Sequence, residues 1–354
     1  MAIADAKTPI AFVEEKRPDF EEVGRLLGES AAANHWTNFG PVWHRLKKHI
    51  ETTLGLPPQR CAIPSASGTH ALYAAAALAC RSAPRRWVTS SYGFKATAIG
   101  PFERAEILDC DRTGLIDLTG VDENRYDGIV ATNPFGLFGE LNRLIAFARR
   151  TGKALIIDNA AAFAGFGRSD HDGIFECLSF HHTKPYGFGE GGCLIVDRAL
   201  EADAKAAMDF GYRWSWPGGR EALSNGKLSD PAAAFILCRQ QSDRTWASGY
   251  QEQFQRVLNI GESLGFTLLA GRDLVGAGTH GNVPLLSPIP VPVDRIENDK
   301  LTLQKYYKPL GDGAVSRDLY ARMVNVPCHP GVAALTDREI EELLATIRSR
   351  ARAA

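Results

Sequence analysis

The amino-acid sequence predicts an α/β protein, with a large domain built on a mixed, mostly parallel sheet and a smaller C-terminal α+β domain. Between residues 86 and 196, short apolar runs alternate with helix-like segments, which is typical of a parallel sheet covered by helices on both faces. With 354 residues the chain exceeds the usual size of one domain. We therefore expect a large domain at 1–240 and a small domain at 241–354.

Six segments are expected to be the strands of the large sheet, because each is a short apolar run bounded by turn or helix signals. They are residues 87–90, 105–110, 127–133, 154–159, 176–180 and 193–196. In sheets of this kind the loops at the carboxyl ends of the strands carry the chemistry. Candidate functional residues are therefore sought where these runs end.

Downstream of these strands the sequence predicts helices. Asp230 followed by Pro231 predicts a helix start, with the aspartate as N-cap, and the segment stays compatible with a helix to about Ser263. A helix of that length is expected to link the two domains. Near the end of the chain, Thr336 and Glu339 have the spacing of a capping box and predict the start of a final helix.

Composition and charge argue against several classes of function. The chain is 45% hydrophobic and 23% charged, as globular proteins are, and its formal net charge of −1 does not favour nucleic acid or an anionic membrane. The sequence begins without the apolar stretch of a secretory signal, and no apolar run is long enough to span a bilayer. The seven cysteines are scattered and never spaced as CxxC, which predicts buried thiols and a cytoplasmic protein.

The stretch SFHHTKPYGFGEGG, residues 179–192, allows three interpretations. His181 and His182 suggest a metal, but adjacent residues after a strand point to opposite faces and could hardly bind one ion, so no metal site is expected. The glycines fit the dinucleotide pattern GxGxxG, but a strand follows them where that pattern needs a helix. We therefore expect these glycines to make a tight connection between two strands.

Lys184 is the third interpretation of the same stretch. A lone lysine is usually a solvated charge, but Phe180, Tyr186 and Phe188 predict an apolar pocket around this one. Burial lowers the pKa of a lysine toward the neutral amine that attacks a carbonyl. A carbonyl cofactor such as pyridoxal phosphate needs a lysine, a carboxylate beside its pyridine nitrogen, a phosphate cradle and a group that covers its ring.

Asp158 is the candidate carboxylate and Phe94 the candidate ring cover. Asp158 ends the strongly apolar run ALIID, where a buried carboxylate is costly unless a cation such as a pyridinium accompanies it. An equally good interpretation makes Asp158 the N-cap of a helix over the following AAAFAG. Phe94 follows a strand end, where its ring could stack on a planar cofactor or simply belong to the core.

The candidate phosphate cradle is the start of an alanine-rich helix. Gly68 and Thr69 open this helix, and the free amides and dipole of a helix N-terminus suit a phosphate. Ser179 could add a hydroxyl. The plain alternative is that Ser67 or Thr69 only caps the helix.

In this order and combination, the residues resemble the DegT family of sugar aminotransferases, pyridoxal-phosphate enzymes of the aspartate aminotransferase fold, which is fold type I. The resemblance covers nearly the whole chain. Its most specific part is SFHHTK followed by GEGG, similar to the family's SFHxTK and GEGG around the Schiff-base lysine. Other matching segments are WTNFGP at 36–41, SGTHAL at 67–72, the aspartate of IIDNAAA, and VNVPCHPGV near the end.

The resemblance implies a role for each candidate residue. Lys184 forms the Schiff base with pyridoxal 5'-phosphate, Asp158 pairs with its pyridine nitrogen, and Phe94 stacks on its ring. The phosphate is held by three residues of the same chain, Gly68, Thr69 and Ser179. Asn225 corresponds to a family asparagine that reaches the phosphate of the neighbouring subunit, which implies a homodimer with shared active sites.

The chain also departs from the family at three places. Ala161 stands about where the family has glutamine or histidine near the ring hydroxyl of the cofactor. Gly226 and Lys227 replace the usual tyrosine and arginine, and ATNPFG stands in place of VHLYG. These departures concern the substrate side of the site more than the cofactor side.

The reaction implied by the resemblance transfers an amino group from glutamate to a keto-sugar. WTNFGP looks most like the subgroup that acts on nucleotide-linked 4-keto-6-deoxy sugars, whose diphosphate needs cationic partners. The candidates for that contact are Arg213, Arg220, Lys227 and Lys95. Two alternatives stay open: amination of a cyclitol or small phosphorylated ketone, and a non-catalytic regulator that binds pyridoxal phosphate.

Overall fold

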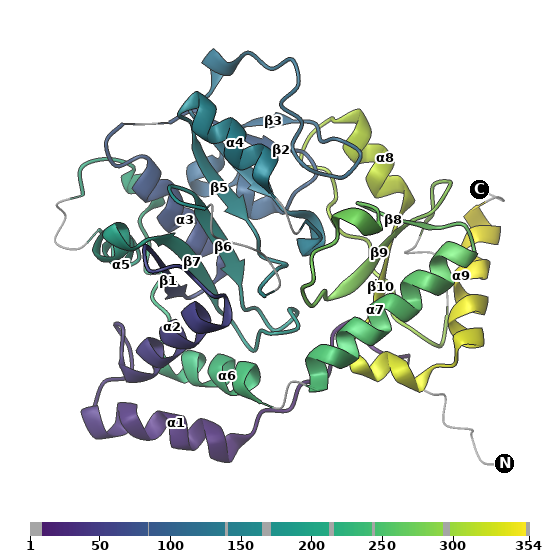
Figure 1. Ribbon diagram of the computed structural model, residues 1–354, viewed down its shortest axis with the longest axis horizontal. Coiled ribbons are helices and arrows are strands. Elements are labelled where there is room, and N and C mark those ends of the chain that lie inside the picture. The colour runs from purple at the N-terminus through teal and green to yellow at the C-terminus, as the bar shows by residue number, and fades with distance from the viewer. Residues whose placement is uncertain are drawn as a thin grey trace.

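The structure is a computed structural model that describes residues 9–83, 85–138, 141–164, 171–211, 216–242, 245–292 and 298–351. These residues form a seven-stranded sheet and a separate three-stranded sheet, each with its own helices (Figure 1). The predicted α/β class, with a large mixed sheet and a smaller C-terminal unit, is confirmed.

The large sheet has the strand order β1-β7-β6-β5-β4-β2-β3. Strand β7 runs antiparallel to both of its neighbours, whereas all other pairs are parallel. All six predicted strands are present, within one or two residues of the expected bounds. The strands are β1 (Arg60–Ser65), β2 (Trp87–Ser90), β3 (Glu106–Leu108), β4 (Gly128–Thr132), β5 (Ala154–Asp158), β6 (Phe175–Ser179) and β7 (Gly192–Asp197).

Strand β1 was not predicted, although all six of its residues are buried. Its sequence RCAIPS contains Pro64, which cannot donate a ladder hydrogen bond and argues against a central strand. The structure resolves this conflict, because β1 pairs with β7 alone and lies at the edge of the sheet.

Helices cover both faces of the large sheet. Helix α3 (Gly68–Ala79) packs with Ile156 and Cys177 in one core, whereas α4 (Asn142–Thr151) packs with Leu155 and Ile157 in the other. Successive residues of β5 therefore point to opposite buried faces, which explains why the strand is continuously apolar. Three other helices of this part of the chain precede residue 210, namely α1 (Phe20–Ala33), α2 (Pro41–Thr53) and α5 (Glu201–Ala207).

Asp230 does not cap its own helix, so that prediction is wrong. Ser229 is the N-cap of α6 (Asp230–Gln241), and its side chain accepts a hydrogen bond from the amide of Ala232. The buried Asp230 carboxylate instead accepts hydrogen bonds from the amides of Val42 and Trp43, both at 3.0 Å. It thereby caps the first turn of α2, which has no side-chain cap of its own.

The single long helix expected from Asp230 to Ser263 is also wrong. Helix α6 ends at Gln241, the backbone of Ser242 is not helical, and a second helix, α7, spans Thr245–Ser263. The two helices have different partners: α6 packs on α1 and α2, whereas α7 packs on β9 and α9. The proposed domain boundary at residues 240 and 241 falls at the end of α6.

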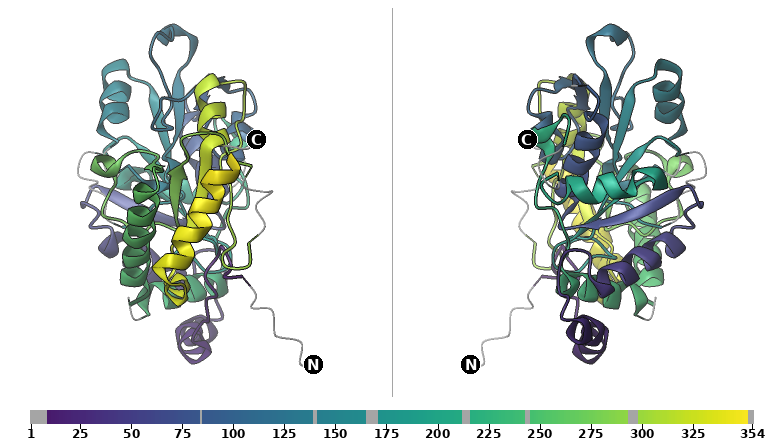
Figure 2. Two further views of the ribbon diagram at one scale, coloured as in Figure 1. Left: turned by 90° about the vertical axis from the view of Figure 1, so that its right-hand side faces the viewer. Right: turned by 90° about the vertical axis from the view of Figure 1, so that its left-hand side faces the viewer.

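The small sheet is antiparallel, with the order β10-β9-β8. Its strands are β8 (Thr267–Leu268), β9 (Asn282–Leu286) and β10 (Met323–Pro327), and α8 (Ala314–Arg322) leads into β10. Helices α7 and α9 (Asp337–Ala351) lie side by side against it (Figure 2). The predicted capping box is confirmed, because Glu339 accepts from the Thr336 amide and Thr336 accepts from the Glu339 amide.

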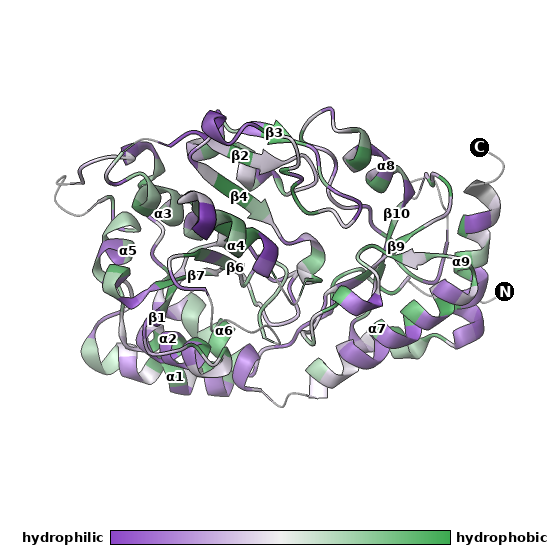
Figure 3. Ribbon diagram, turned by 45° about the horizontal axis from the view of Figure 1, so that its top comes forward, coloured by the Kyte–Doolittle hydropathy of each residue, from purple (hydrophilic) through white to green (hydrophobic). Residues whose placement is uncertain are grey.

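Helix α7 is amphipathic, and its buried face packs against β8 and β9 of the small sheet. Its buried residues recur every three or four positions, while polar residues occupy the other side, as the colours along α7 show (Figure 3).

All seven cysteines are buried and unpaired, as predicted. Among the described residues, no helix combines the length and apolar character needed to cross a bilayer.

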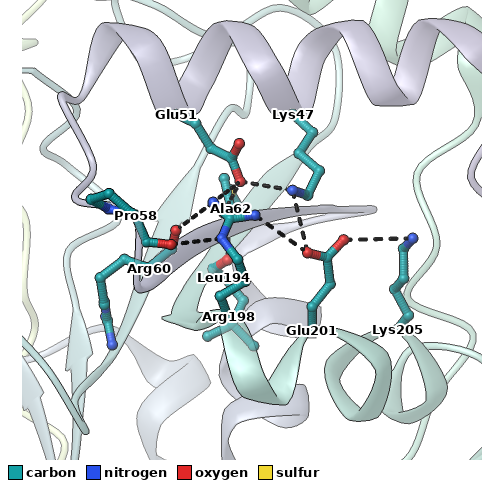
Figure 4. Close-up of polar contacts among 10 residues, drawn as sticks. Lys47, Glu51, Pro58, Arg60, Ala62, Leu194, Arg198, Glu201 and Lys205 are labelled. Atoms are coloured by element: carbon teal, nitrogen blue, oxygen red, sulfur yellow. Dashed lines mark hydrogen bonds and ion pairs between the residues drawn. The ribbon is translucent and has the colours of Figure 1, made fainter.

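An ion cluster joins α2, β1 and α5 (Figure 4). Lys47 lies between the carboxylates of Glu51 and Glu201, at 2.7 and 3.4 Å. Arg198 approaches the same two carboxylates at 3.6 and 3.7 Å. Glu51 also accepts a hydrogen bond from the backbone amide of Ala62. The cluster fixes edge strand β1 against the two helices.

Candidate active site

A cavity of about 820 Å³ lies between the large and small sheets. Its walls come from both parts of the chain. Six of the seven residues predicted to bind a cofactor line it, namely Gly68, Thr69, Phe94, Asp158, Ser179 and Lys184. The sequence-predicted residues therefore meet in one place, although they are spread over more than a hundred positions of the chain.

Lys184 is carried by the loop between β6 and β7. The ladder between these strands extends into the loop, because the amides of Phe180 and His182 donate to the carbonyls of Gly191 and Gly189 at 2.8 Å. A turn follows in which the Lys184 amide donates to His181 O at 2.9 Å. The expectation that the glycines connect two strands tightly is confirmed.

The aromatic residues near Lys184 do not line its cavity, so the predicted pocket is only partly correct. Phe180 and Tyr186 are buried beneath the turn, where both pack against Phe163. Phe188 stacks on Phe235 of α6, with ring centroids 5.3 Å apart. These rings support the backbone of the turn from behind. The Lys184 side chain itself faces the space between the sheets.

Asp158 and Lys184 influence each other electrostatically within the cavity. Burial lowers the pKa of Lys184, an effect that the charge of Asp158 opposes. Burial raises the pKa of Asp158 to about 6, against the opposing effects of the Ala160 amide and Lys184. Asp158 is only 3% exposed, and within the described part of the chain it forms no salt bridge. A cationic ligand would compensate this buried carboxylate.

The alternative role of Asp158 as a helix N-cap is not found. Its carboxylate accepts a hydrogen bond from the Ala160 amide at 3.2 Å, but residues 159–164 form a turn and contain no helix. The adjacent Asn159 donates to Glu176 at 2.7 Å and accepts from Asn133 at 2.8 Å. This chain of buried amides ties the ends of β4 and β5 to β6 and thereby fixes the position of Asp158.

The start of α3 forms the candidate phosphate cradle. Ser67 caps the helix by accepting from the amide of His70 at 3.2 Å, and the amides of the first turn have no acceptor within the helix. The helix start is pressed against the sheet: a Cβ atom on Gly192 would lie 2.3 Å from the backbone of Ser67. Ser179 lies beside Gly68, where a Cβ atom would meet the Ser179 Cβ at 3.2 Å.

Phe94 and Asn225 are both exposed, in different surroundings. Phe94 is 52% exposed on the cavity wall, which removes the alternative that it belongs to the core. Asn225 forms an isolated β-bridge with Asp209 and does not line the cavity of its own chain. Its exposed side chain is compatible with the predicted contact to a neighbouring subunit, which stays a prediction.

Of the three described cations that were expected to meet a diphosphate, one lines the cavity. Lys95 does, whereas Lys227 pairs with Asp209 and Arg220 donates to the carbonyl of Trp216 at 3.1 Å. Arg213 lies outside the described residues. An unpredicted cation, Lys308, also lines the cavity and is exposed.

The small domain contributes aromatic residues that sequence reasoning missed. Tyr307 has a left-handed backbone with φ of 60°, which is strained for a residue with an aromatic side chain. Its ring packs on Phe135 at 4.7 Å and its hydroxyl accepts from the Phe135 amide at 3.4 Å. Tyr306 lies edge-on to Phe12 of the N-terminal segment. The two adjacent tyrosines in KYYKP are the feature of the sequence that could have indicated an aromatic cavity wall here.

His181 and His182, the residues that suggested a metal, contact other side chains of their own loop. The Nδ1 atom of His181 lies 2.9 Å from the Thr183 hydroxyl, and its Nε2 atom lies 3.4 Å from Glu190. His182 packs edge-on against Phe188. Among the described residues, no three histidine, cysteine or acidic side chains are grouped closely enough to hold a metal ion.

These features fit pyridoxal phosphate. The cavity combines a buried carboxylate that forms no salt bridge with any described residue, a lysine with a lowered pKa, an exposed ring and a helix N-terminus with free amides. The large mixed sheet with its smaller antiparallel partner is the fold of the pyridoxal-phosphate-dependent aminotransferases. Residues 19–256 match the model of the DegT/DnrJ/EryC1/StrS aminotransferase family, and the chain belongs to this family. The sequence-based assignment is confirmed.

Individual relatives and solved structures agree with this membership. Protein Rv3402c of Mycobacterium tuberculosis is 29% identical over 252 residues, which are 64% of this chain and 59% of that protein. The chain thus spans 59% of the length of Rv3402c and of two further mycobacterial relatives that it matches equally well. The dTDP-4-amino-4,6-dideoxy-D-glucose transaminase of Shigella dysenteriae is 24% identical over 386 residues, covering 96% of this chain and 98% of that one.

The solved structure of DesI, in the presence of its TDP-sugar product, superposes with a TM-score of 0.79. It shares 20% sequence identity, and the superposition covers 98% of this chain and 93% of that one. At this identity the likeness establishes the fold.

Proposed function

We propose that the protein is a pyridoxal-phosphate-dependent aminotransferase that moves an amino group from glutamate to a nucleotide-linked 4-keto-6-deoxy sugar. The observation that carries the proposal is the meeting, in one cavity, of Lys184 with the buried Asp158 carboxylate and the start of α3. Membership of an aminotransferase family supports it.

The cofactor, when bound, supplies an electron sink for a carbanion on the substrate carbon. Asp158 holds a proton on the pyridine nitrogen, which its buried negative charge favours. Lys184 Nζ, whose pKa burial lowers, would accept the proton from the substrate carbon as a base and then, as an acid, deliver it to the aldehyde carbon of the cofactor. Asp158 is the last residue of β5, and Lys184 lies in the loop that follows the neighbouring strand β6.

Three further groups of the chain orient the bound cofactor. The amides of Gly68 and Thr69 and the hydroxyl of Ser179 hold its phosphate, and Phe94 covers its ring. We include Asn225 of a second copy as a further phosphate contact, so the working enzyme is a homodimer. The exposure of Asn225 outside the cavity of its own chain supports this assignment.

The acceptor sugar occupies the part of the cavity beneath the small domain. Lys95 and Lys308, from opposite walls, are the exposed cations on the lining and would bind the diphosphate of a nucleotide sugar. The name of the Shigella dysenteriae relative and the TDP-sugar of the DesI structure support this class of acceptor.

The test is a steady-state assay with glutamate and two acceptors, a nucleoside-diphosphate-linked 4-keto-6-deoxy sugar and a cyclitol ketone. Lys95→Ala and Lys308→Ala should each raise the KM for the linked sugar by about tenfold, because each removes a charge-assisted contact. Lys48→Ala, an exposed lysine on α2, is the control and should leave that KM unchanged. Turnover of the cyclitol ketone alone would contradict the proposed acceptor.

A further inference from the structure

The backbone of the turn that carries Lys184 is held by side chains from distant parts of the chain. The Lys16 ammonium donates to three carbonyls of this turn: His182 O at 2.6 Å, Gly187 O at 2.8 Å and the carbonyl of Lys184 itself. A lysine ammonium has three donors, so all of them are used on one turn. The N-terminal segment is therefore attached at three points to the backbone of the turn that carries Lys184.

Helix α6 binds the two carbonyls that lie between those of Lys184 and Gly187. Arg239 Nε donates to Pro185 O at 2.9 Å, and Gln240 Nε2 donates to Tyr186 O at 3.3 Å. Arg239 is itself paired with Glu14 at 2.6 Å, and both side chains are at most 14% exposed. Four consecutive carbonyls, from Lys184 to Gly187, therefore each accept a hydrogen bond from a side chain outside the loop.

The segment around Lys16 is built so that alternate residues face the turn. Glu14 and Lys16 point inward to Arg239 and the carbonyls, while Glu15 and Arg17 pair with each other at 2.8 Å in solvent, 78% and 85% exposed. The same segment continues to the small domain, where Ile10 forms a β-bridge with Leu301. It therefore runs from one domain, past the cavity, to the Lys184 turn.

We propose that Lys16 is a positioning residue, whose ammonium fixes the turn so that Lys184 Nζ stays directed into the cavity. This inference rests on the proposed function of Lys184. The turn's own hydrogen bonds run from the amides of Lys184 and Gly187 to the carbonyls of His181 and Lys184, and from the amide of Thr183 to His181 Nδ1. Hydrogen bonds from side chains to the carbonyls of the turn come from Lys16, Arg239 and Gln240.

The charge state of Lys16 sets the conditions of the test. Burial, followed by the charges of Arg239 and Lys184, lowers the pKa of Lys16 to about 7, and Glu14 opposes this shift. The His182 ring is the other titratable group that faces it. Exchange measurements belong at pH 6, where Lys16 is mostly charged and can use all three of its donors.

The experiment compares Lys16→Met with Arg17→Met, the same substitution one residue further along. Hydrogen exchange of the whole protein should be at least about tenfold faster at the amides of Lys184 and Gly187 in Lys16→Met. With glutamate, kcat should fall by roughly 100-fold while KM stays within about twofold, because the reacting amine is misplaced but the donor site is intact. Arg17→Met should match the wild type in both measurements.

Exchange in the turn that is the same in Lys16→Met and Arg17→Met would overturn the inference, and so would equal kcat values. If Lys16→Met does not fold, Lys16→Gln, which keeps two of the three donors, serves in its place and should show the same changes to a smaller degree. If the wild type shows no turnover, the proposed function fails, but the exchange rates still decide whether Lys16 fixes the turn.

Discussion

Replacing Asp158 with asparagine should change how the stability of the cofactor-free protein depends on pH. Burial raises the pKa of this carboxyl from 3.8 to about 6 in the folded state. A group with a raised pKa stabilises the fold while it is protonated, below about pH 4, and that contribution is lost as the pH rises to about 6. Above that pH the folded protein carries the full cost of a buried carboxylate.

The magnitude follows from the two pKa values. Their difference of about two pH units corresponds to about 3 kcal/mol, at 1.36 kcal/mol for each unit. Asparagine has a similar shape and does not ionise. Between pH 4 and pH 8, the free energy of unfolding of Asp158→Asn should therefore rise relative to the wild type by about 3 kcal/mol.

Urea unfolding of both cofactor-free proteins at several pH values measures this difference. Asp312→Asn is the control, because the Asp312 side chain is fully exposed, and it should give a difference that hardly varies with pH. A difference between Asp158→Asn and the wild type that is constant from pH 4 to pH 8 would refute the burial argument. Bound pyridoxal phosphate should reduce the pH dependence of the wild type, since its pyridinium compensates the carboxylate.

Three further substitutions test other parts of the structure. Gly192→Ala should destabilise the protein by about 2 kcal/mol in thermal melts and weaken cofactor binding, because the added Cβ would lie 2.3 Å from the backbone of Ser67. The control is Gly28→Ala, in open space on α1, which should be neutral or slightly stabilising in the same measurement. Lys47→Met should lower the free energy of unfolding by about 2 kcal/mol, because it removes the buried cation that contacts both Glu51 and Glu201, whereas a loss no larger than that of the exposed Lys48→Met would contradict the importance of this cluster. Lys184→Ala should keep the circular dichroism and melting behaviour of a folded protein but lose all turnover, and turnover at the wild-type rate would end the assignment of this residue.

The strands of the large sheet could be predicted because their environment leaves a simple pattern. Strands β4 to β7 are buried on both faces, so each is a mostly apolar run that stands out from the chain around it, although β6 contains the buried Glu176. Strand β1 is equally buried, but Pro64 contradicts the pattern, and only its edge position makes the proline acceptable.

The break between α6 and α7 could not be predicted for a different reason. Both halves of the segment favour a helix, and no glycine or proline stands near Ser242 to end one. The helices separate because α6 packs on the large domain and α7 on the small sheet, so tertiary contacts decide where the first one ends.

Some residues of the site could likewise be recognised from their local sequence, whereas others are brought there only by the fold. Asp158, Gly68 and Lys184 each stand where a strand ends or a helix begins, and chemistry is expected at such places. Lys16 and Tyr307 reach the site from segments more than a hundred residues from Lys184; nothing in the local sequence marks Lys16, and only the pair of adjacent tyrosines marks Tyr307. Only the folded chain shows that they meet there.

The visible absorption spectrum of the purified protein, recorded before and after addition of glutamate, tests the central assignment most directly. The account predicts an absorption band from pyridoxal phosphate bound through Lys184, which glutamate converts to the spectrum of the aminated cofactor and which Lys184→Ala lacks. A protein that shows no band even after pyridoxal phosphate is added would contradict the account.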